Sequence, residues 1–138
     1  MKSTTFYKYF TLLIALVLIP AVLMAKTPKD NTKHTIYLFG YSTCLSDTVV
    51  YITEVQSLDG VELTKEKFLK DRQEYSAQLK TYLEPVCGVA HQTAAVFYGQ
   101  NKKKVEKKYL KLRKNLLDKH KAFQEVKATS FQFQVIKQ

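Results

Sequence analysis

The chain contains few of the residues from which metal sites and nucleophilic sites are made. It has two cysteines, three histidines and no tryptophan among its 138 residues. The histidines, at positions 34, 91 and 120, share no metal-ligand spacing, and two cysteines do not complete a zinc site. No catalytic or cofactor motif is present either. The sequence therefore predicts a protein that is not an enzyme, with no catalytic residues, no metal site and no cofactor.

The first 25 residues have the three-part layout of a secretory signal peptide. Lys2 and Lys8 supply positive charge, residues 10–24 form a run without charge, and Ala25 offers a small residue for cleavage. As a membrane anchor, a helix from Phe10 to Ala25 would span about 24 Å of a ~30 Å hydrocarbon core, and Pro20 interrupts it. We expect cleavage after Ala25 or nearby, export to the periplasm or outside the cell, and no integral membrane segment after cleavage.

Acidic residues are scarce throughout the chain. There are 12 aspartates and glutamates against 22 lysines and arginines, which gives a formal net charge of +10. Only Lys2 and Lys8 leave with the predicted signal, so the remaining 113 residues carry +8. Seven tyrosines and six phenylalanines in this part support a packed aromatic core and argue against disorder. We expect one domain over residues 34–138, preceded by a flexible tether over residues 26–33.

The two cysteines, Cys44 and Cys87, stand 43 positions apart. An even number of cysteines in an exported protein predicts a disulfide bond. Closing a loop of this length would stabilise the fold by about 4 kcal/mol in the chain-entropy description. The alternative is two unrelated thiols, one or both of them buried. Cys44 also lies far from any cleavage site, which argues against a lipoprotein.

The hydrophobic pattern predicts the element order ββαβαβ. The predicted strands cover 34–41, 48–56, 89–98 and 123–136, and the predicted helices cover 64–83 and 101–120. Thr64 would cap the first helix and Pro85 would stop it, and a bulge near Thr129 would explain a change of face in the last strand. Each βαβ crossover should be right-handed and make its strands parallel, and the opening hairpin makes the first strand antiparallel to the others. We expect an α+β fold close to ferredoxin-like, with a mixed four-stranded sheet and both helices on one face. Cys44 and Cys87 would then lie at the same end of the sheet.

Four segments carry a family resemblance: FG at 39–40, DTVVYIT at 47–53, FLKDRQEYSAQLKTYL at 68–83 and KKYLKLRK at 107–114. On these segments the chain resembles a family of small uncharacterised exported proteins of the Bacteroidota, over most of the part that follows the signal. None of the segments is a catalytic signature. The resemblance implies a bacterial source and an exported location, and it implies no particular activity.

The predicted second helix carries most of the positive charge. Ten basic residues stand between positions 102 and 121, against Glu106 and Asp118. Opposite the apolar stripe that begins at Val105, five lysines crowd one arc of the helix. They are Lys103, Lys104, Lys107, Lys111 and Lys114. Such a face attracts anions within about 8 Å in physiological salt. The alternative is a solvated face that only keeps the protein soluble.

Arg72 lies at the centre of the predicted apolar face of the first helix. A charge in that place must be paired or must extend to solvent. We expect a partly buried ion pair with Asp47 or Glu54. The alternative is an arginine that lines a pocket for a carboxylate or phosphate ligand, with Ser76 and Tyr82 adding hydroxyl groups.

These observations predict a small non-enzymatic binding or assembly module of the cell envelope. Its partner would be an anionic envelope component or an acidic protein. Nucleic acid is disfavoured by the signal peptide and because the basic helix has one arginine, Arg113, for bidentate base contacts. The runner-up is a structural domain that forms a homodimer through an exposed edge of the C-terminal strand, at FQFQVIK (131–137). A small hydrolase comes third.

Overall fold

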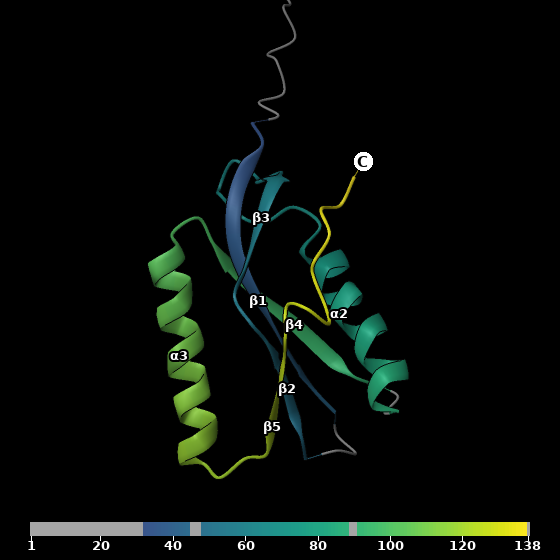
Figure 1. The fold of residues 1–138 in the computed structure, drawn as a ribbon. Coiled ribbons are helices and arrows are strands. Elements are labelled where there is room, and N and C mark those ends of the chain that lie inside the picture. The colour runs from purple at the N-terminus through teal and green to yellow at the C-terminus, as the bar shows by residue number, and fades with distance from the viewer. Residues whose placement is uncertain (1–31, 45–47, 89–90, 138) are drawn as a thin grey trace, which may run out of the picture. The chain divides into compact units, whose positions relative to one another are not determined.

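The computed structural model of this chain describes residues 32–44, 48–88 and 91–137, apart from the side chains of residues 86 and 87. These residues form an α+β fold with five strands and two helices (Figure 1). The elements are β1 (His34–Thr43), β2 (Val50–Thr53), β3 (Gln56–Val61), α2 (Arg72–Cys87), β4 (Thr93–Gly99), α3 (Lys102–Asp118) and β5 (Phe123–Val126). The predicted signal (1–25) and most of the predicted tether (26–33) lie outside the described residues.

β1 is the central strand of a mixed sheet. On one side it pairs antiparallel with β4 in an unbroken register from Tyr37 opposite Gly99 to Thr43 opposite Thr93. On the other side its C-terminal half pairs antiparallel with β2 and its N-terminal half with β3. β5 completes the sheet as a parallel neighbour of β2. β1 therefore runs antiparallel to the strands on both of its sides, as predicted.

The predicted second strand, over residues 48–56, contains only β2, and a further strand, β3, begins at its last residue, Gln56, and continues to Val61, so the sheet has five strands and not four. The ladder is interrupted next to Thr53, whose hydroxyl accepts a hydrogen bond from the buried amide of Gly40 at 2.8 Å. Gly40 also lies directly against α2, because a Cβ atom there would collide with the side chain of Leu79. The hydrogen bond from the Gly40 amide to the Thr53 hydroxyl thus replaces a bond between backbone groups, at the point of the sheet that α2 covers.

The helices α2 and α3 lie on opposite faces of the sheet, which corrects the prediction of two helices on one face (Figure 1). Leu79 of α2 packs in the hydrophobic cluster that contains Ile36 and Leu38. Val105 of α3 packs in a second cluster with Phe39, which points to the other face of β1. Helices cover both faces of the sheet, so the fold is not a ferredoxin-like sandwich.

The strand order explains the placement of the helices. The connection through α2 runs from β3 past β1 to β4, and the connection through α3 returns from β4 past β1 and β2 to β5. Crossovers of the same right hand that travel in opposite directions place their helices on opposite faces of a sheet. The prediction also assumed right-handed crossovers but had no information on which strands are neighbours.

The helix α2 begins eight residues later than predicted. Thr64 closes a short loop and caps no helix, since its amide donates to the carbonyl of Phe68 at 2.8 Å and its hydroxyl accepts from the amide of Phe68 at 3.2 Å. Lys67 and Asp71 both have positive φ angles, 63° and 54°, which interrupt a helical path. Pro85 lies in the last turn and does not end the helix before Cys87.

The helix α3 closely follows its prediction. Asn101 caps it, because its Oδ1 accepts the amide of Lys104 at 3.1 Å. Val105, Tyr109 and Leu116 are buried against the sheet, as the apolar stripe requires. β4 begins at Thr93 and not at residue 89, and residues 89 and 90 lie outside the described part.

The last strand, β5, is much shorter than predicted. In place of a bulge near Thr129, a turn in which the amides of Ser130 and Phe131 bond the carbonyl of Lys127 takes the chain off the sheet. Residues 131–137, the C-terminal segment, run extended beside α2, and Phe133 is buried. The side chain of Gln56 holds the backbone of Phe131 and Phe133, at 2.9 and 3.0 Å. Gln78 holds both backbone groups of Gln134, each at 2.8 Å.

Candidate functional site

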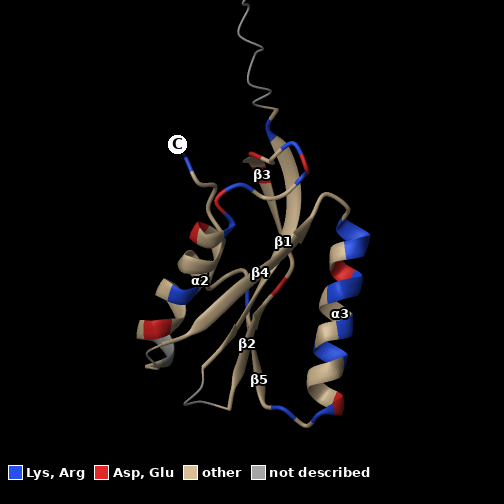
Figure 2. Cartoon of the chain, turned by 180° about the vertical axis from the view of Figure 1, so that it is seen from behind, with Lys and Arg blue, Asp and Glu red and all other residues tan. Residues whose placement is uncertain are grey.

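The basic face of α3 is fully presented to solvent. All five predicted lysines are exposed: Lys103, Lys104, Lys107, Lys111 and Lys114. Figure 2 shows basic residues along the length of the helix. Within the described residues none of these five forms an ion pair, whereas Lys102 pairs with Glu106 at 3.7 Å. The positive charge of this face is therefore not neutralised by neighbouring acids.

Two leucines interrupt the basic face. Leu110 and Leu117 are 59% and 57% exposed. At ~100° per residue, Lys114 lies about 40° from Leu110 and about 60° from Leu117 around the helix axis. We call Lys103, Lys107, Lys114 and the two leucines the outer face of α3. This face combines apolar side chains with unneutralised cations.

A groove lies between α3 and β4, on the flank of the helix beside the outer face. It has a volume of about 290 Å³ and is lined by Phe39, Phe97, Lys108, Lys111, Leu112 and Asn115. Phe39 and Phe97 stack with ring centroids 5.0 Å apart and an interplanar angle of 16°. Phe39 is buried, whereas Phe97 is 40% exposed. The α3–β4 groove therefore has an apolar floor with two cations beside it.

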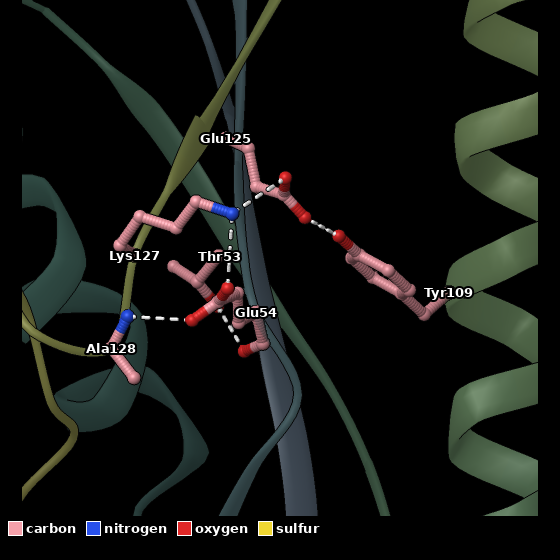
Figure 3. Close-up of polar contacts among 6 residues, drawn as sticks. All are labelled: Thr53, Glu54, Tyr109, Glu125, Lys127 and Ala128. Atoms are coloured by element: carbon pink, nitrogen blue, oxygen red, sulfur yellow. Dashed lines mark hydrogen bonds and ion pairs between the residues drawn. The ribbon is translucent and has the colours of Figure 1, made fainter.

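The opposite flank of α3 carries a polar network (Figure 3). The Nζ atom of Lys127 lies 3.2 Å from a carboxylate oxygen of Glu54 and 3.2 Å from one of Glu125. The other oxygen of Glu54 accepts the amide of Ala128 at 2.8 Å. The hydroxyl of Tyr109 donates to Glu125. The network joins α3 to β5 and to the link between β2 and β3.

The ionisation of the network fits a structural role. The amide of Ala128, and then Lys127, hold the pKa of Glu54 below its ordinary value. The bond from Tyr109, and then Lys127, do the same for the pKa of Glu125. Both carboxylates raise the pKa of Lys127, Glu54 most. Burial, and then the bond to Glu125, raise the pKa of Tyr109. Each of these shifts moves the pKa of its group further away from neutral pH. A general acid or base needs the opposite, a pKa near the working pH.

Arg72 is not a buried residue of the apolar face. It is the first residue of α2 and is exposed, because the buried stripe of the helix starts at Tyr75. The predicted ion pair with Glu54 is wrong, since Glu54 pairs with Lys127. The other predicted partner, Asp47, lies outside the described residues.

The structure gives little support to the alternative that Arg72 lines a pocket for a carboxylate or phosphate ligand. Arg72 lines an open hollow of about 460 Å³ with Phe68 and Tyr98, but Asp71 and Glu74 line it too. These carboxylates oppose the binding of an anion. Ser76 donates to the carbonyl of Arg72 at 3.4 Å, and Tyr82 packs on Phe131, so the predicted hydroxyl groups do not gather in the hollow.

Of the two side chains in the predicted disulfide, the structure describes only that of Cys44. Cys44 is buried immediately after β1. The side chain of Cys87 lies outside the described residues. The Cys44–Cys87 bond therefore stays a prediction.

The sequence pattern predicts neither the polar network nor the α3–β4 groove. Glu125 and Lys127 break the apolar alternation of the predicted last strand, and this break was the available signal for the network. Phe97 gave no signal of its own, because its exposure follows from the position of β4 at the end of the sheet.

No known protein family, curated protein or solved structure matches this chain. In the described ranges, no group of three or more His, Cys, Asp or Glu side chains is placed to hold a metal ion. Neither of the helices in these ranges is long and apolar enough to cross a membrane. The surface of α3 is therefore the candidate site.

Proposed function

We propose that this protein is an exported, non-enzymatic binding module that attaches through α3 to an anionic lipid surface of the cell envelope. The outer face of α3 carries the proposal. Its lysines are exposed and make no ion pair with other described residues. A lysine close to an anionic membrane contributes about 1 kcal/mol of attraction.

The exposed leucines favour lipid over an acidic glycan or an acidic protein. Leu110 and Leu117 lie two turns apart on the same side of the helix, among the lysines. A helix that lies on a membrane places apolar side chains into the headgroup region while its lysines stay among the phosphates. A glycan chain has no apolar layer into which these leucines would insert.

The test is sedimentation with vesicles that contain phosphatidylglycerol, compared with vesicles of phosphatidylcholine alone. We expect retention on the anionic vesicles that weakens as salt rises, because exposed charges are screened. The variant Lys103→Glu, Lys107→Glu, Lys114→Glu should lose this retention with a nearly unchanged melting temperature, since surface substitutions cost within ~0.5 kcal/mol each. The matched control Lys33→Glu, Lys65→Glu, Lys137→Glu changes the net charge equally at exposed positions elsewhere and should retain most of the binding.

A further double variant distinguishes binding to lipid from binding to other anions. Leu110→Ser with Leu117→Ser should weaken vesicle binding and leave binding to an acidic polysaccharide unchanged. If the wild-type protein binds the polysaccharide and not the vesicles, the partner is a glycan. If it shows no salt-dependent retention on either, the lysines only keep the protein soluble.

Pairing through the C-terminal segment, the runner-up function, receives no support from the geometry. Gln56 and Gln78 already occupy backbone groups of this segment. Export, cleavage after Ala25 or nearby, and the Cys44–Cys87 bond belong to the proposal as further parts. Mass spectrometry of the secreted protein tests the cleavage, because it should find Lys26 or a close neighbour as the first residue.

A further inference from the structure

The strand β4 lies at one end of the sheet, and among the described residues no strand pairs with its outer edge, which we call the free edge of β4. The amide of Gly40 donates to the hydroxyl of Thr53, so the backbone of Gly40 points toward β2 and away from β4. Backbone groups alternate in direction along a strand, so those of Phe39 point toward β4 and meet Phe97. It follows that every second residue of β4 directs its N–H and C=O groups outward. These residues are Ala94, Val96 and Tyr98, and no other described strand pairs with them.

This edge lacks the features by which sheets prevent pairing with other chains. β4 is seven residues long, has the sequence TAAVFYG without a charge or a proline, and pairs with β1 without a bulge. At the other end of the sheet β5 has four residues, and Glu125 and Lys127 stand in or beside it. Free edges in natural sheets are usually short, charged or interrupted. One end of this sheet is protected in that way and the β4 end is not.

The α3–β4 groove would select the side chains of an added strand. A new strand would lie ~4.8 Å from β4, and every second side chain would point to the face that carries α3. On that face the floor of the groove contains the exposed ring of Phe97, and Lys108 and Lys111 line it as well. An apolar side chain fits the floor, and a carboxylate next to it on the same face fits the two lysines.

We propose that the free edge of β4 binds an extended acidic segment of a partner protein as an additional strand, with its carboxylates at Lys108 and Lys111. Main-chain bonds to β4 would supply affinity, and the groove would supply specificity. This goes beyond attachment through the outer face of α3, because it uses the flank of the helix that faces β4 and a different kind of partner.

A second copy of this chain fits the edge poorly. In a two-fold pair of β4 strands, both α3 helices would lie on the same face of one continuous sheet. Lys108 and Lys111 of the two copies would then face one another, and like charges in such a place oppose association. Charge complementarity therefore favours an acidic partner over a homodimer.

The test uses the purified full chain and a labelled peptide that repeats Val-Ser-Glu-Ser, so that valine and glutamate alternate on one face of a strand, and it is followed by fluorescence anisotropy. We expect binding to the unmodified peptide. The same peptide with an N-methyl group on every amide should not bind through either of its edges, because methylation removes the donors and blocks the approach of a neighbouring strand. The peptide variant leaves the protein unchanged, so its result does not depend on the folding of a mutant.

Two protein variants complete the test. Lys108→Glu with Lys111→Glu should weaken peptide binding by about tenfold or more, while Lys103→Glu with Lys114→Glu on the outer face should change it by less than about threefold. Ala94→Pro should abolish binding, because it removes an outward N–H and leaves the β1–β4 bonds in place.

Four results would overturn the proposal: no binding of the unmodified peptide, equal binding of the methylated peptide, equal effects of the two lysine pairs, or a dimer of the free protein that Ala94→Pro dissociates. The last result would assign the edge to a second copy. Vesicle binding depends on Lys103, Lys107 and Lys114, so either proposal can fail without the other.

Discussion

The hydroxyl of Tyr109 donates a hydrogen bond to the carboxylate of Glu125, and this bond ties α3 to the edge strand β5 (Figure 3). Tyr109 also belongs to the buried stripe of α3, where its ring packs edge-on against Phe39 with centroids 5.4 Å apart. One side chain thus anchors the helix through both apolar and polar contacts. The face of α3 that the proposals use depends on this anchor for its position.

Replacing Tyr109 by phenylalanine should keep the ring contacts and remove the bond to Glu125. We expect the free energy of unfolding to fall by about 1 kcal/mol, since a bond to a charged acceptor is lost at a partly exposed site. Chemical denaturation measures this change. Tyr98→Phe serves as the control, because no hydrogen bond of the Tyr98 hydroxyl is found within the described part. An equal effect of the two substitutions would show that the bond to Glu125 does not stabilise the fold.

Acid should destabilise the protein through the two glutamates of the network. The pKa values of Glu54 and Glu125 are both lowered from 4.5 in the folded state. Their contribution to stability is therefore complete above the unfolded value and is lost as the pH falls below about 4.5 through the folded values. Melting temperatures between pH 7 and pH 3 should fall less steeply in the double variant Glu54→Gln, Glu125→Gln than in wild type. Glu66→Gln, at an exposed position outside the network, should leave the slope unchanged.

The sequence predicts those elements whose signals are local. The cap at Asn101 and the stripe from Val105 to Leu116 lie within one continuous segment, so α3 and the exposure of its lysines were predictable. The start of α2 was not predictable, because Lys67 and Asp71 adopt positive φ angles that cannot be foreseen from their residue types. The error on Arg72 follows from that start, since an arginine in the first turn has no sheet to pack against.

The remaining errors concern pairing between distant segments. The faces on which α2 and α3 lie depend on the order of the strands, and the order is decided by contacts across the sheet. The free edge of β4 depends on the same order. The C-terminal segment alternates like a strand, yet Gln56 and Gln78 hold it beside α2. An alternating pattern reports which side chains are buried and does not identify the partner of the backbone.

Gln56→Ala should release the C-terminal segment. The substitution leaves the carbonyl of Phe131 and the amide of Phe133 without their partner, in a place that is partly buried. We expect a loss of about 1–3 kcal/mol of stability and faster amide hydrogen exchange over residues 131–134. Gln78→Ala removes the equivalent bonds from Gln134 at an exposed site and should cost less. Exchange rates that do not change in Gln56→Ala would show that packing of the phenylalanines alone holds the segment.

The Cys44–Cys87 bond should be present in protein recovered from the compartment to which the protein is exported. Digestion without reductant should give one cross-linked peptide pair, and mass spectrometry identifies it. Reduction should lower the stability by about 4 kcal/mol if chain entropy dominates. Two alkylated thiols in protein that was never exposed to reductant would contradict the prediction.

The contact between Gly40 and Leu79 should be visible as an energetic coupling. A methyl group at Gly40 would collide with the Leu79 side chain, and it would also lie 3.1 Å from Phe133. Since Leu79 is fully buried, Gly40→Ala should destabilise the protein by about 1–3 kcal/mol through overpacking. Leu79→Ala should cost about 2–5 kcal/mol through the cavity that it leaves. In the double variant the new methyl group occupies part of this cavity, so the combined loss should be smaller than the sum by at least about 1 kcal/mol. Denaturant unfolding of the four proteins gives the cycle, and strictly additive losses would mean that α2 does not pack directly on Gly40.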